Sequence, residues 1–208
     1  MIENCIISHS RNGIDKPTHA IFLLHGRGGS AENMLGVFNP LVELNKLIIF
    51  SIQAKNEWYP IPNGANDQDE AVSGLFENLP QIREYIHNAI KENNIPVQNT
   101  VLIGFSAGAV VAIELAIHFQ ESYGLVVAHS GAILCPENVK KSTISTSFIV
   151  LHNHDDACFS WGERYIPMHN AFIENGYDVI FVERSFGNHM IFKNDIDYIS
   201  LIVSQYLS

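Results

Sequence analysis

The segment Gly104-Phe105-Ser106-Ala107-Gly108, which directly follows the apolar run at residues 100–103, decides the fold predicted for this chain. A serine with a glycine two positions away on each side is typical of a sharp turn from a strand into a helix. Such a turn brings neighbouring backbones so close that a Cβ atom in place of either glycine would obstruct it. Residues 107–117 are apolar on nearly every face, as expected of a helix buried against a sheet. The pattern favours an exposed, nucleophilic Ser106 over a plain glycine-rich turn.

Short apolar runs alternate with helical patterns on both sides of this segment. We expect strands at residues 20–24, 47–52, 100–103, 125–129, 147–151 and 179–183, and helices at residues 32–38, 70–93, 106–120, 163–175 and 195–206. This alternation predicts an α/β fold with a mostly parallel sheet and helices on both faces. The strands are apolar almost throughout, which indicates that both faces of the sheet are covered. The longest loop, residues 53–69, is too short for a separate lid domain.

The composition indicates one globular domain that spans residues 1–208. Of the 208 residues, 47% are hydrophobic and 16% are charged, which suffices for a full core. The net charge of -10 is dispersed and argues against nucleic acid or an anionic membrane as a partner. No basic N-terminal segment leads into a long apolar stretch, and no apolar run has the length of a transmembrane helix.

The cysteines Cys5, Cys135 and Cys158 have no metal-like spacing and fit a reducing compartment. We therefore expect a cytoplasmic protein without a transmembrane segment. The sequence does not decide the oligomeric state and leaves a homodimer open.

Ser106 needs a histidine to accept its proton, and that histidine needs a carboxylate to hold the correct tautomer. In enzymes with this serine turn, the order along the chain is serine, then Asp or Glu, then histidine. The strand expected at residues 147–151 runs towards Asp155 and Asp156, and His189 follows the strand at residues 179–183. These positions are at the carboxyl ends of strands, where the reactive groups of a parallel sheet gather. His189 is preferred to His169, which lies within a helical pattern, but the pattern does not decide between the two aspartates.

The segment 152–156 also contains residue types that suit zinc or a harder cation: His152, His154, Asp155 and Asp156. No second group of such residues lies nearby in the sequence, so we assign no metal site. The simpler interpretation is that His152 is a hydrogen-bonded residue that shapes the loop. His154 and Asp155 then have a solvated or capping role.

Donors for an oxyanion are expected in the glycine-rich segment 25–30, which follows the strand at residues 20–24. In enzymes with the serine turn, the donors are backbone N–H groups of an early loop and of the residue after the nucleophile. We therefore assign the oxyanion hole to the backbone N–H groups of Arg27 and Ala107. A phosphate-binding turn is the alternative, but the spacing of a P-loop and its Lys-Ser/Thr pair are absent. The Arg27 side chain fits a solvated surface position better than an anion-binding one.

The chain resembles the phospholipase/carboxylesterase family of α/β-hydrolases, which includes acyl-protein thioesterases and small bacterial carboxylesterases. The resemblance covers nearly the whole chain, and the joint order of its motifs is more specific than any single motif. The motifs are residues 24–32 (LHGRGGSAE), 58–60 (WYP), 104–108 (GFSAG), 130–131 (SG), His152 with Asp156, and residues 187–189 (GNH). In the family the acid stands four residues after the histidine that ends its strand, which implies Asp156. The resemblance also implies an α/β-hydrolase fold with no large cap domain and no cofactor.

Three departures from the family pattern limit what the resemblance implies. Many relatives have glutamine at the position of Ala107 and glycine at that of Asn153, and the family histidine often follows glycine, whereas here Asn188 intervenes. A backbone donor survives the first change. Trp58 and Tyr59 lie in a loop beside the expected site, so we predict substrate contacts for them, with core packing as the alternative.

The predicted activity is hydrolysis of a small-molecule or lipid-like carboxylic ester or thioester through an acyl-enzyme, with Ser106, Asp156 and His189 as the catalytic triad. Two alternatives stay open. A non-catalytic small-molecule-binding protein on the same fold would keep the pocket and lack turnover. A dienelactone-hydrolase-like enzyme would ordinarily have cysteine as its nucleophile, whereas Cys135 and Cys158 stand elsewhere.

Overall fold

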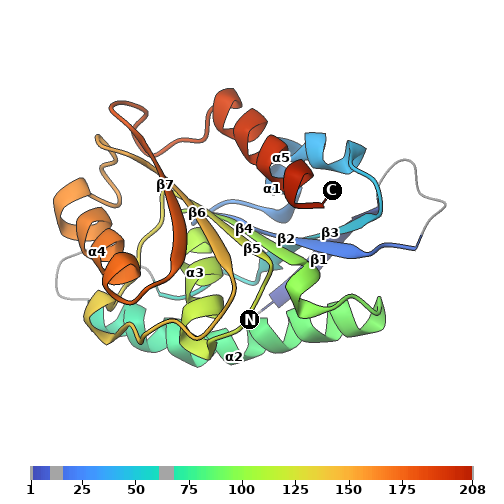
Figure 1. Cartoon of the computed structure of the whole chain (residues 1–208), viewed down its shortest axis with the longest axis horizontal. Coiled ribbons are helices and arrows are strands. Elements are labelled where there is room, and N and C mark those ends of the chain that lie inside the picture. The colour runs from blue at the N-terminus through green and yellow to red at the C-terminus, as the bar shows by residue number, and fades with distance from the viewer. Residues whose placement is uncertain (1, 10–15, 61–67, 208) are drawn as a thin grey trace.

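A seven-stranded sheet forms the centre of the protein (Figure 1). The computed structural model describes residues 2–9, 16–60 and 68–207. Within these residues the strand order is β1-β3-β2-β4-β5-β6-β7. The strands are β1 (Ile2–His9), β2 (His19–Leu24), β3 (Leu47–Ala54), β4 (Thr100–Phe105), β5 (Leu125–His129), β6 (Ser147–Asn153) and β7 (Asp178–Arg184). β1 pairs antiparallel with β3, and all other neighbouring strands are parallel, which confirms the predicted, mostly parallel sheet.

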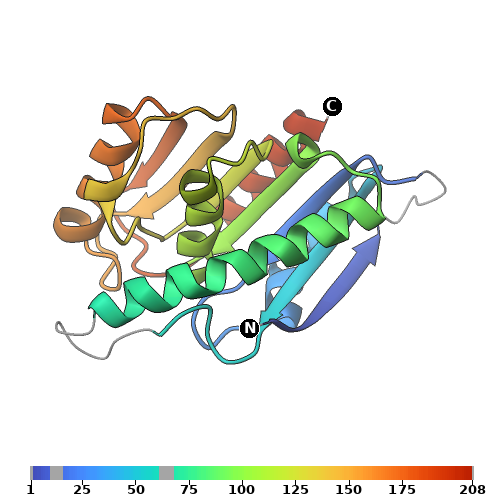
Figure 2. The same ribbon diagram turned by 90° about the horizontal axis from the view of Figure 1, so that it is seen from below.

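Helices cover both faces of the sheet (Figures 1 and 2). On one face lie α1 (Ala31–Val37) and α5 (Lys193–Leu207). On the other lie α2 (Gln68–Glu92), α3 (Ala107–Phe119) and α4 (Ile166–Glu174). No large cap is present among the described residues, and none of their helices is long and apolar enough to span a membrane.

Alternate side chains of the central strands belong to two hydrophobic clusters, one on each face of the sheet. In β2, Phe22 and Leu24 pack into the cluster that includes α3, whereas Ile21 and Leu23 pack into the cluster that includes α5. All four side chains are fully buried, and each such burial contributes about 1.5–3 kcal/mol to stability. This two-sided burial explains why the strands are apolar at nearly every position.

Helix α3 is buried along residues 107–117 because it packs on the sheet and is also covered by α2. Its uniformly apolar sequence therefore has the predicted cause. Strand β1, in contrast, lies outside the predicted strands. It is an edge strand with a mixed, half-exposed sequence, and its position depends on backbone pairing with β3, for example Ile7 with Phe50.

The loop predicted at residues 53–69 is shorter than expected, since β3 extends to Ala54 and α2 begins at Gln68. Residues 61–67 of this loop lie outside the described residues. Because β4, β6 and β7 run in parallel, their carboxyl ends meet at one edge of the sheet. The segments that follow these strands carry Ser106, Asp156 and His189.

Candidate active site

Ser106 occupies the turn between β4 and α3 in a strained backbone conformation. Its φ is 56° and its ψ is -120°, a combination that costs a residue with a side chain about 1–3 kcal/mol. The surrounding backbone holds this conformation: the Ser106 N–H donates to the His129 carbonyl at 2.9 Å, and the Ser106 carbonyl accepts the N–H of Ala109 at 2.9 Å. The turn presents the hydroxyl at the carboxyl edge of the sheet.

Gly104 and Gly108 are required by the space around this turn. A Cβ atom at Gly104 would lie 2.3 Å from the carbonyl oxygen of Gly108. A Cβ atom at Gly108 would lie 2.1 Å from the carbonyl oxygen of Leu24. Both contacts are with backbone atoms, so a larger residue at either position would push α3 away from the sheet. The predicted reason for the two glycines is confirmed.

A continuous chain of hydrogen bonds joins Ser106, His189 and Asp156. Nε2 of His189 lies 2.8 Å from Oγ of Ser106. Nδ1 of His189 lies 2.8 Å from Oδ2 and 3.0 Å from Oδ1 of Asp156. An ionised carboxylate only accepts hydrogen bonds, so Nδ1 carries the ring proton and Nε2 is left to accept the proton of Ser106. The structure thus brings together the three residues predicted as the triad.

The backbone that follows β6 turns around the Asp156 carboxylate. Its Oδ1 accepts the backbone N–H of Cys158 at 2.8 Å and that of Phe159 at 2.9 Å. Burial alone would raise the pKa of the Asp156 carboxyl, but the hydrogen bond with His189 and those from the two amides hold this pKa below its usual value. Asp156 is therefore an anion at neutral pH, which is the state that orients an imidazole and stabilises its charged form.

Asp155 has a different partner from its neighbour Asp156. Its Oδ1 accepts the backbone N–H of Asn188 at 2.7 Å. Asp155 therefore holds the backbone next to His189, while Asp156 is the carboxylate that meets the ring. The assignment implied by the family resemblance agrees with this geometry.

Two of the departures from the family pattern contact each other. The Asn153 side chain donates to the carbonyl of Asn188 at 2.8 Å. Asn188 has a φ of 51°, a left-handed conformation that asparagine tolerates better than most residues. A Cβ atom at Gly187, whose φ is +155°, would lie 2.6 Å from the Asn153 side chain. The two asparagines together fix the turn that carries His189.

The glycine-rich loop that follows β2 lies against the serine turn. A Cβ atom at Gly26 would meet Cβ of Ser106 at 3.1 Å. Ala107 is the first residue of α3, where backbone N–H groups have no partner within the helix. The N–H groups of Arg27 and Ala107 thus belong to segments that border Ser106, and their role as oxyanion donors stays a prediction. The Arg27 side chain is 46% exposed and pairs with Glu57 at 3.4 Å, the predicted surface position.

Trp58 and Tyr59 are core residues, which corrects the predicted substrate contact. Their exposed fractions are 1% and 4%. The indole N–H of Trp58 donates to the carbonyl of His25 at 2.7 Å, and Nε2 of His25 accepts the backbone N–H of Ala54 at 3.1 Å. Burial lowers the pKa of His25, so the ring stays neutral and keeps this acceptor. These bonds tie the loop after β2 to the end of β3, a role that aromatic residues in a loop do not reveal in the sequence.

The two histidines of the segment 152–156 have different partners. His152 is buried, with Nε2 2.8 Å from the carbonyl of Phe159 and its ring stacked on Tyr165. This confirms its predicted role in shaping the loop. His154 is exposed, and its Nε2 lies 3.8 Å from the carboxylate of Glu183.

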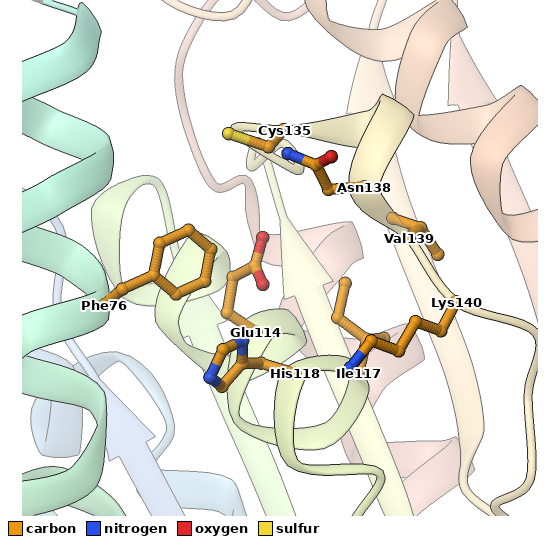
Figure 3. A pocket seen from close by; sticks show the side chains of 8 residues that line it. All are labelled: Phe76, Glu114, Ile117, His118, Cys135, Asn138, Val139 and Lys140. Atoms are coloured by element: carbon orange, nitrogen blue, oxygen red, sulfur yellow. The ribbon is translucent and has the colours of Figure 1, made fainter.

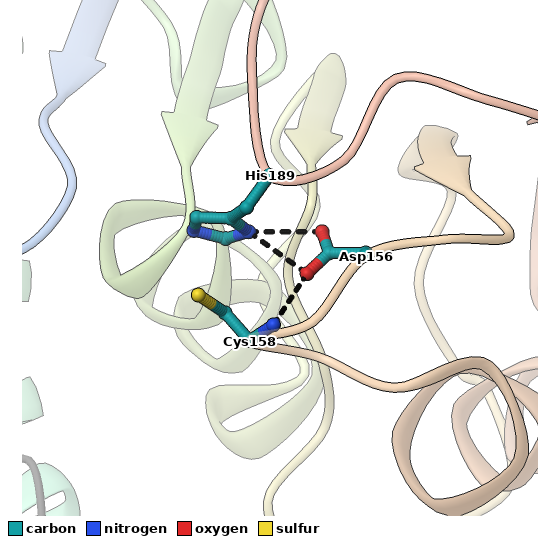
Figure 4. A group of neighbouring side chains, drawn as sticks. All are labelled: Asp156, Cys158 and His189. Carbon is teal, nitrogen blue, oxygen red and sulfur yellow. Dashed lines mark hydrogen bonds and ion pairs between the residues drawn. The ribbon is translucent and has the colours of Figure 1, made fainter.

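Cys158 also lies at this site, although the sequence pattern does not predict it there. Its thiol, a carboxylate oxygen of Asp156 and a ring nitrogen of His189 lie within 4.8 Å of one another (Figure 4). The Cys158 side chain is exposed and its thiol is free. The only signal in the sequence is the short spacing between Cys158 and Asp156.

An ion pair between a half-buried arginine and a buried aspartate joins the two ends of the segment that carries His189, and the sequence pattern does not predict it. Arg184 ends β7 and Asp195 lies in the first turn of α5, and their side chains approach to 2.5 Å. Burial alone would raise the pKa of Asp195, but the hydrogen bond with His129 and the charge of Arg184 keep it below its usual value. Both ends of the segment 185–192 are thereby fixed to the sheet.

A separate cavity of about 70 Å³ lies between α2, α3 and the turn that contains Cys135 (Figure 3). Glu114 points into it from α3 and is 3% exposed. Oε1 of Glu114 has no hydrogen-bond partner among the described residues. Burial raises the pKa of Glu114 to about 8, although the backbone N–H of Leu134 binds the carboxylate and opposes this shift. Glu114 is therefore mostly protonated in the folded protein at neutral pH.

Glu114→Gln is expected to remove part of the pH dependence of stability. Between pH 5 and pH 8 the unfolded chain ionises Glu114 while the folded chain keeps it protonated, so the free energy of unfolding falls as the pH rises. One unit corresponds to about 1.4 kcal/mol, so over the three pH units from 5 to 8 the free energy of unfolding can fall by at most about 4 kcal/mol. Urea unfolding at several pH values should show a flatter profile for Glu114→Gln. Glu137→Gln, which changes an exposed carboxylate nearby, is the control. Equal pH profiles for the wild type and both variants would contradict the raised pKa of Glu114.

The chain is similar to known proteins in both sequence and fold. Residues 7–191 match the model of the phospholipase/carboxylesterase family. The chain also has the fold of esterase PE8, with a TM-score of 0.85, 17% identity and 98% of each chain covered. A Bacillus cereus carboxylesterase is similar with a TM-score of 0.81 and 16% identity, over 99% of this chain and 95% of that one. A phospholipase/carboxylesterase from Dyadobacter fermentans is similar with a TM-score of 0.75 and 22% identity, over 96% of this chain and 95% of that one. The fold is thus that of an α/β-hydrolase, and because the family model matches most of its length, the chain belongs to the phospholipase/carboxylesterase family of hydrolases.

Proposed function

We propose that this protein hydrolyses carboxylic esters or thioesters by a serine mechanism, with Ser106 as the nucleophile, His189 as the base and Asp156 as the orienting acid. One observation carries the proposal: the unbroken set of hydrogen bonds from Oγ of Ser106 through the His189 ring to the buried Asp156 carboxylate, with no distance above 3.0 Å. Such a set converts a hydroxyl, which is a weak nucleophile by itself, into one that can attack a carbonyl carbon.

The reaction begins when Oγ of Ser106 attacks the acyl carbon and Nε2 of His189 takes the hydroxyl proton. The negative charge that develops on the carbonyl oxygen is stabilised by the N–H groups of Arg27 and Ala107. His189 then gives the proton to the departing alkoxide or thiolate, which leaves an acyl-enzyme on Ser106. Water attacks this ester in the second half of the reaction, with His189 again accepting a proton and returning it to Oγ. Asp156 stays ionised throughout and stabilises the imidazolium.

Exposed apolar residues next to His189 in the sequence favour a substrate with an apolar part. Phe186, Met190 and Phe192 are 82%, 56% and 40% exposed, and each lies within three residues of His189 in the sequence. Exposed apolar side chains grouped beside a reactive centre are typical of a surface that binds an apolar ligand. This grouping supports an acyl or alcohol group with hydrocarbon character.

The two alternatives predict different results. A binding protein on this fold would bind an ester-like ligand without turnover. A dienelactone-hydrolase-like enzyme would have cysteine in the serine turn, and Ser106 occupies that position instead.

The test is a turnover assay with p-nitrophenyl esters of increasing acyl length, together with one acyl thioester and one phosphocholine lipid. We expect hydrolysis of at least one ester or thioester, with Michaelis–Menten saturation. If the purified protein binds an ester-like ligand but hydrolyses none of these substrates at any pH between 6 and 9, the hydrolase mechanism fails and the binding protein takes its place.

A further inference from the structure

Three potential metal ligands of different chemistry lie close together in the candidate site. The thiol of Cys158, a carboxylate oxygen of Asp156 and a ring nitrogen of His189 all lie within 4.8 Å of one another (Figure 4). Zinc binds this combination of sulfur, nitrogen and oxygen ligands at distances of about 2.0–2.3 Å, usually in a tetrahedral arrangement. The three atoms are near enough for side-chain rotation to bring them onto one ion.

The hydrogen bonds of Asp156 leave one of its oxygens available. Oδ1 accepts two backbone N–H groups and also lies 3.0 Å from Nδ1 of His189. Among the described residues, Oδ2 has a hydrogen bond only with the His189 ring, at 2.8 Å. A carboxylate oxygen can accept more than one contact, so Oδ2 is the oxygen that can bind a cation without loss of the backbone turn.

The Cys158 thiol is the ligand that a cation from solvent meets, and it determines which cations are preferred. The Cys158 backbone is held by the hydrogen bond from its N–H to Asp156, while its side chain is exposed. A cation from solvent therefore meets this thiol at the surface. Thiolate selects soft or borderline cations such as Zn²⁺ over hard cations such as Mg²⁺.

We propose that Asp156, Cys158 and His189 form an inhibitory site for a thiophilic divalent cation, represented by Zn²⁺. Binding replaces the S–H bond of Cys158 by a sulfur–metal bond and releases the thiol proton to solvent, with no change of oxidation state. Coordination at Nε2 of His189 uses the lone pair that must accept the proton of Ser106. Coordination at Nδ1 moves the ring proton to Nε2, with the same result. The ion thus blocks the base of the proposed hydrolase without being part of the reaction, and the inference rests on that proposed function only for its effect on turnover.

The experiment combines inhibition with a direct measure of metal binding. The full chain is freed of metal with a chelator, the chelator is removed, and initial rates on a short-chain p-nitrophenyl ester are measured during titration with ZnCl₂ or MgCl₂. In parallel, CoCl₂ is added and the thiolate-to-cobalt charge-transfer absorption is recorded. Cys158→Ser removes the proposed sulfur ligand, and Cys135→Ser removes a thiol outside the group.

We expect Zn²⁺ to inhibit the wild type and Cys135→Ser, Mg²⁺ to have no effect, and a chelator to restore the rate. Cys158→Ser should need at least about tenfold more Zn²⁺ for half-inhibition, and should lack the cobalt absorption, because one ligand is lost. Equal Zn²⁺ sensitivity of wild type and Cys158→Ser, or the absence of the cobalt absorption in the wild type, would overturn the proposal. The cobalt measurement needs no turnover, so a protein without esterase activity would refute the proposed function and still test the metal site.

Discussion

Replacing Ser106 by alanine is expected to abolish ester hydrolysis, because the acyl-enzyme can no longer form. The remaining rate should be the roughly 10³–10⁴-fold acceleration over water that binding and oxyanion stabilisation supply when a triad is dismantled. A fluorophosphonate probe should label one residue of the wild type, identified by peptide mass spectrometry as Ser106, and should not label the variant. The fold should persist, and the variant is expected to be no less stable than the wild type, since it keeps the backbone turn and loses only a hydroxyl.

Ser73→Ala is the matched control for this experiment. Ser73 lies in α2 with an exposed side chain, and its hydroxyl donates to the carbonyl of Glu70. Its turnover and its labelling should equal those of the wild type. Labelling that persists in Ser106→Ala would show that another residue is the nucleophile.

Asp156→Asn is expected to lower kcat by about 10⁴-fold, whereas Asp155→Asn should lower it less than about tenfold. The amide that replaces the Asp156 carboxylate can donate a hydrogen bond to Nδ1, which favours the tautomer with the proton on Nε2 and removes the acceptor for the Ser106 proton. Asp155 accepts the backbone N–H of Asn188, and the amide oxygen of an asparagine can accept the same hydrogen bond. The measurement is kcat for both variants on the best ester found in the assay series.

These two variants are well matched, because the residues are adjacent in sequence and both substitutions replace a carboxylate by an amide. Circular dichroism and a thermal melt establish that both variants fold. Equal losses, or a greater loss for Asp155→Asn, would place the orienting acid at position 155 or outside this segment. Such a result would also contradict the role that the proposed mechanism gives to the hydrogen bonds between His189 and Asp156.

Local pattern determined most of the fold and the position of the turn that carries Ser106. The strands β2 to β7 and the helices follow from apolar runs and their periods, because elements buried on both faces leave a strong signal in the sequence. The turn at Ser106 is also local: Gly104 and Gly108 are required by atoms of the adjoining strands and helix, and their spacing alone indicates this. The exception is β1, whose half-exposed residues carry little apolar signal and whose place depends on pairing with β3.

Tertiary structure decided which side chains meet. Nothing in two adjacent aspartates tells which of them points at His189; the turn around the Asp156 carboxylate selects it, and Asp155 is left to hold Asn188. Trp58 faces inward and donates its indole N–H to the His25 carbonyl, and a loop sequence does not encode that direction. The sequence by itself therefore determined the architecture and the chemical type of the site, since both arise from residues near one another in the chain. Side-chain partners were decided only by the fold, because each depends on a segment that is distant in sequence and adjacent only after the strands align.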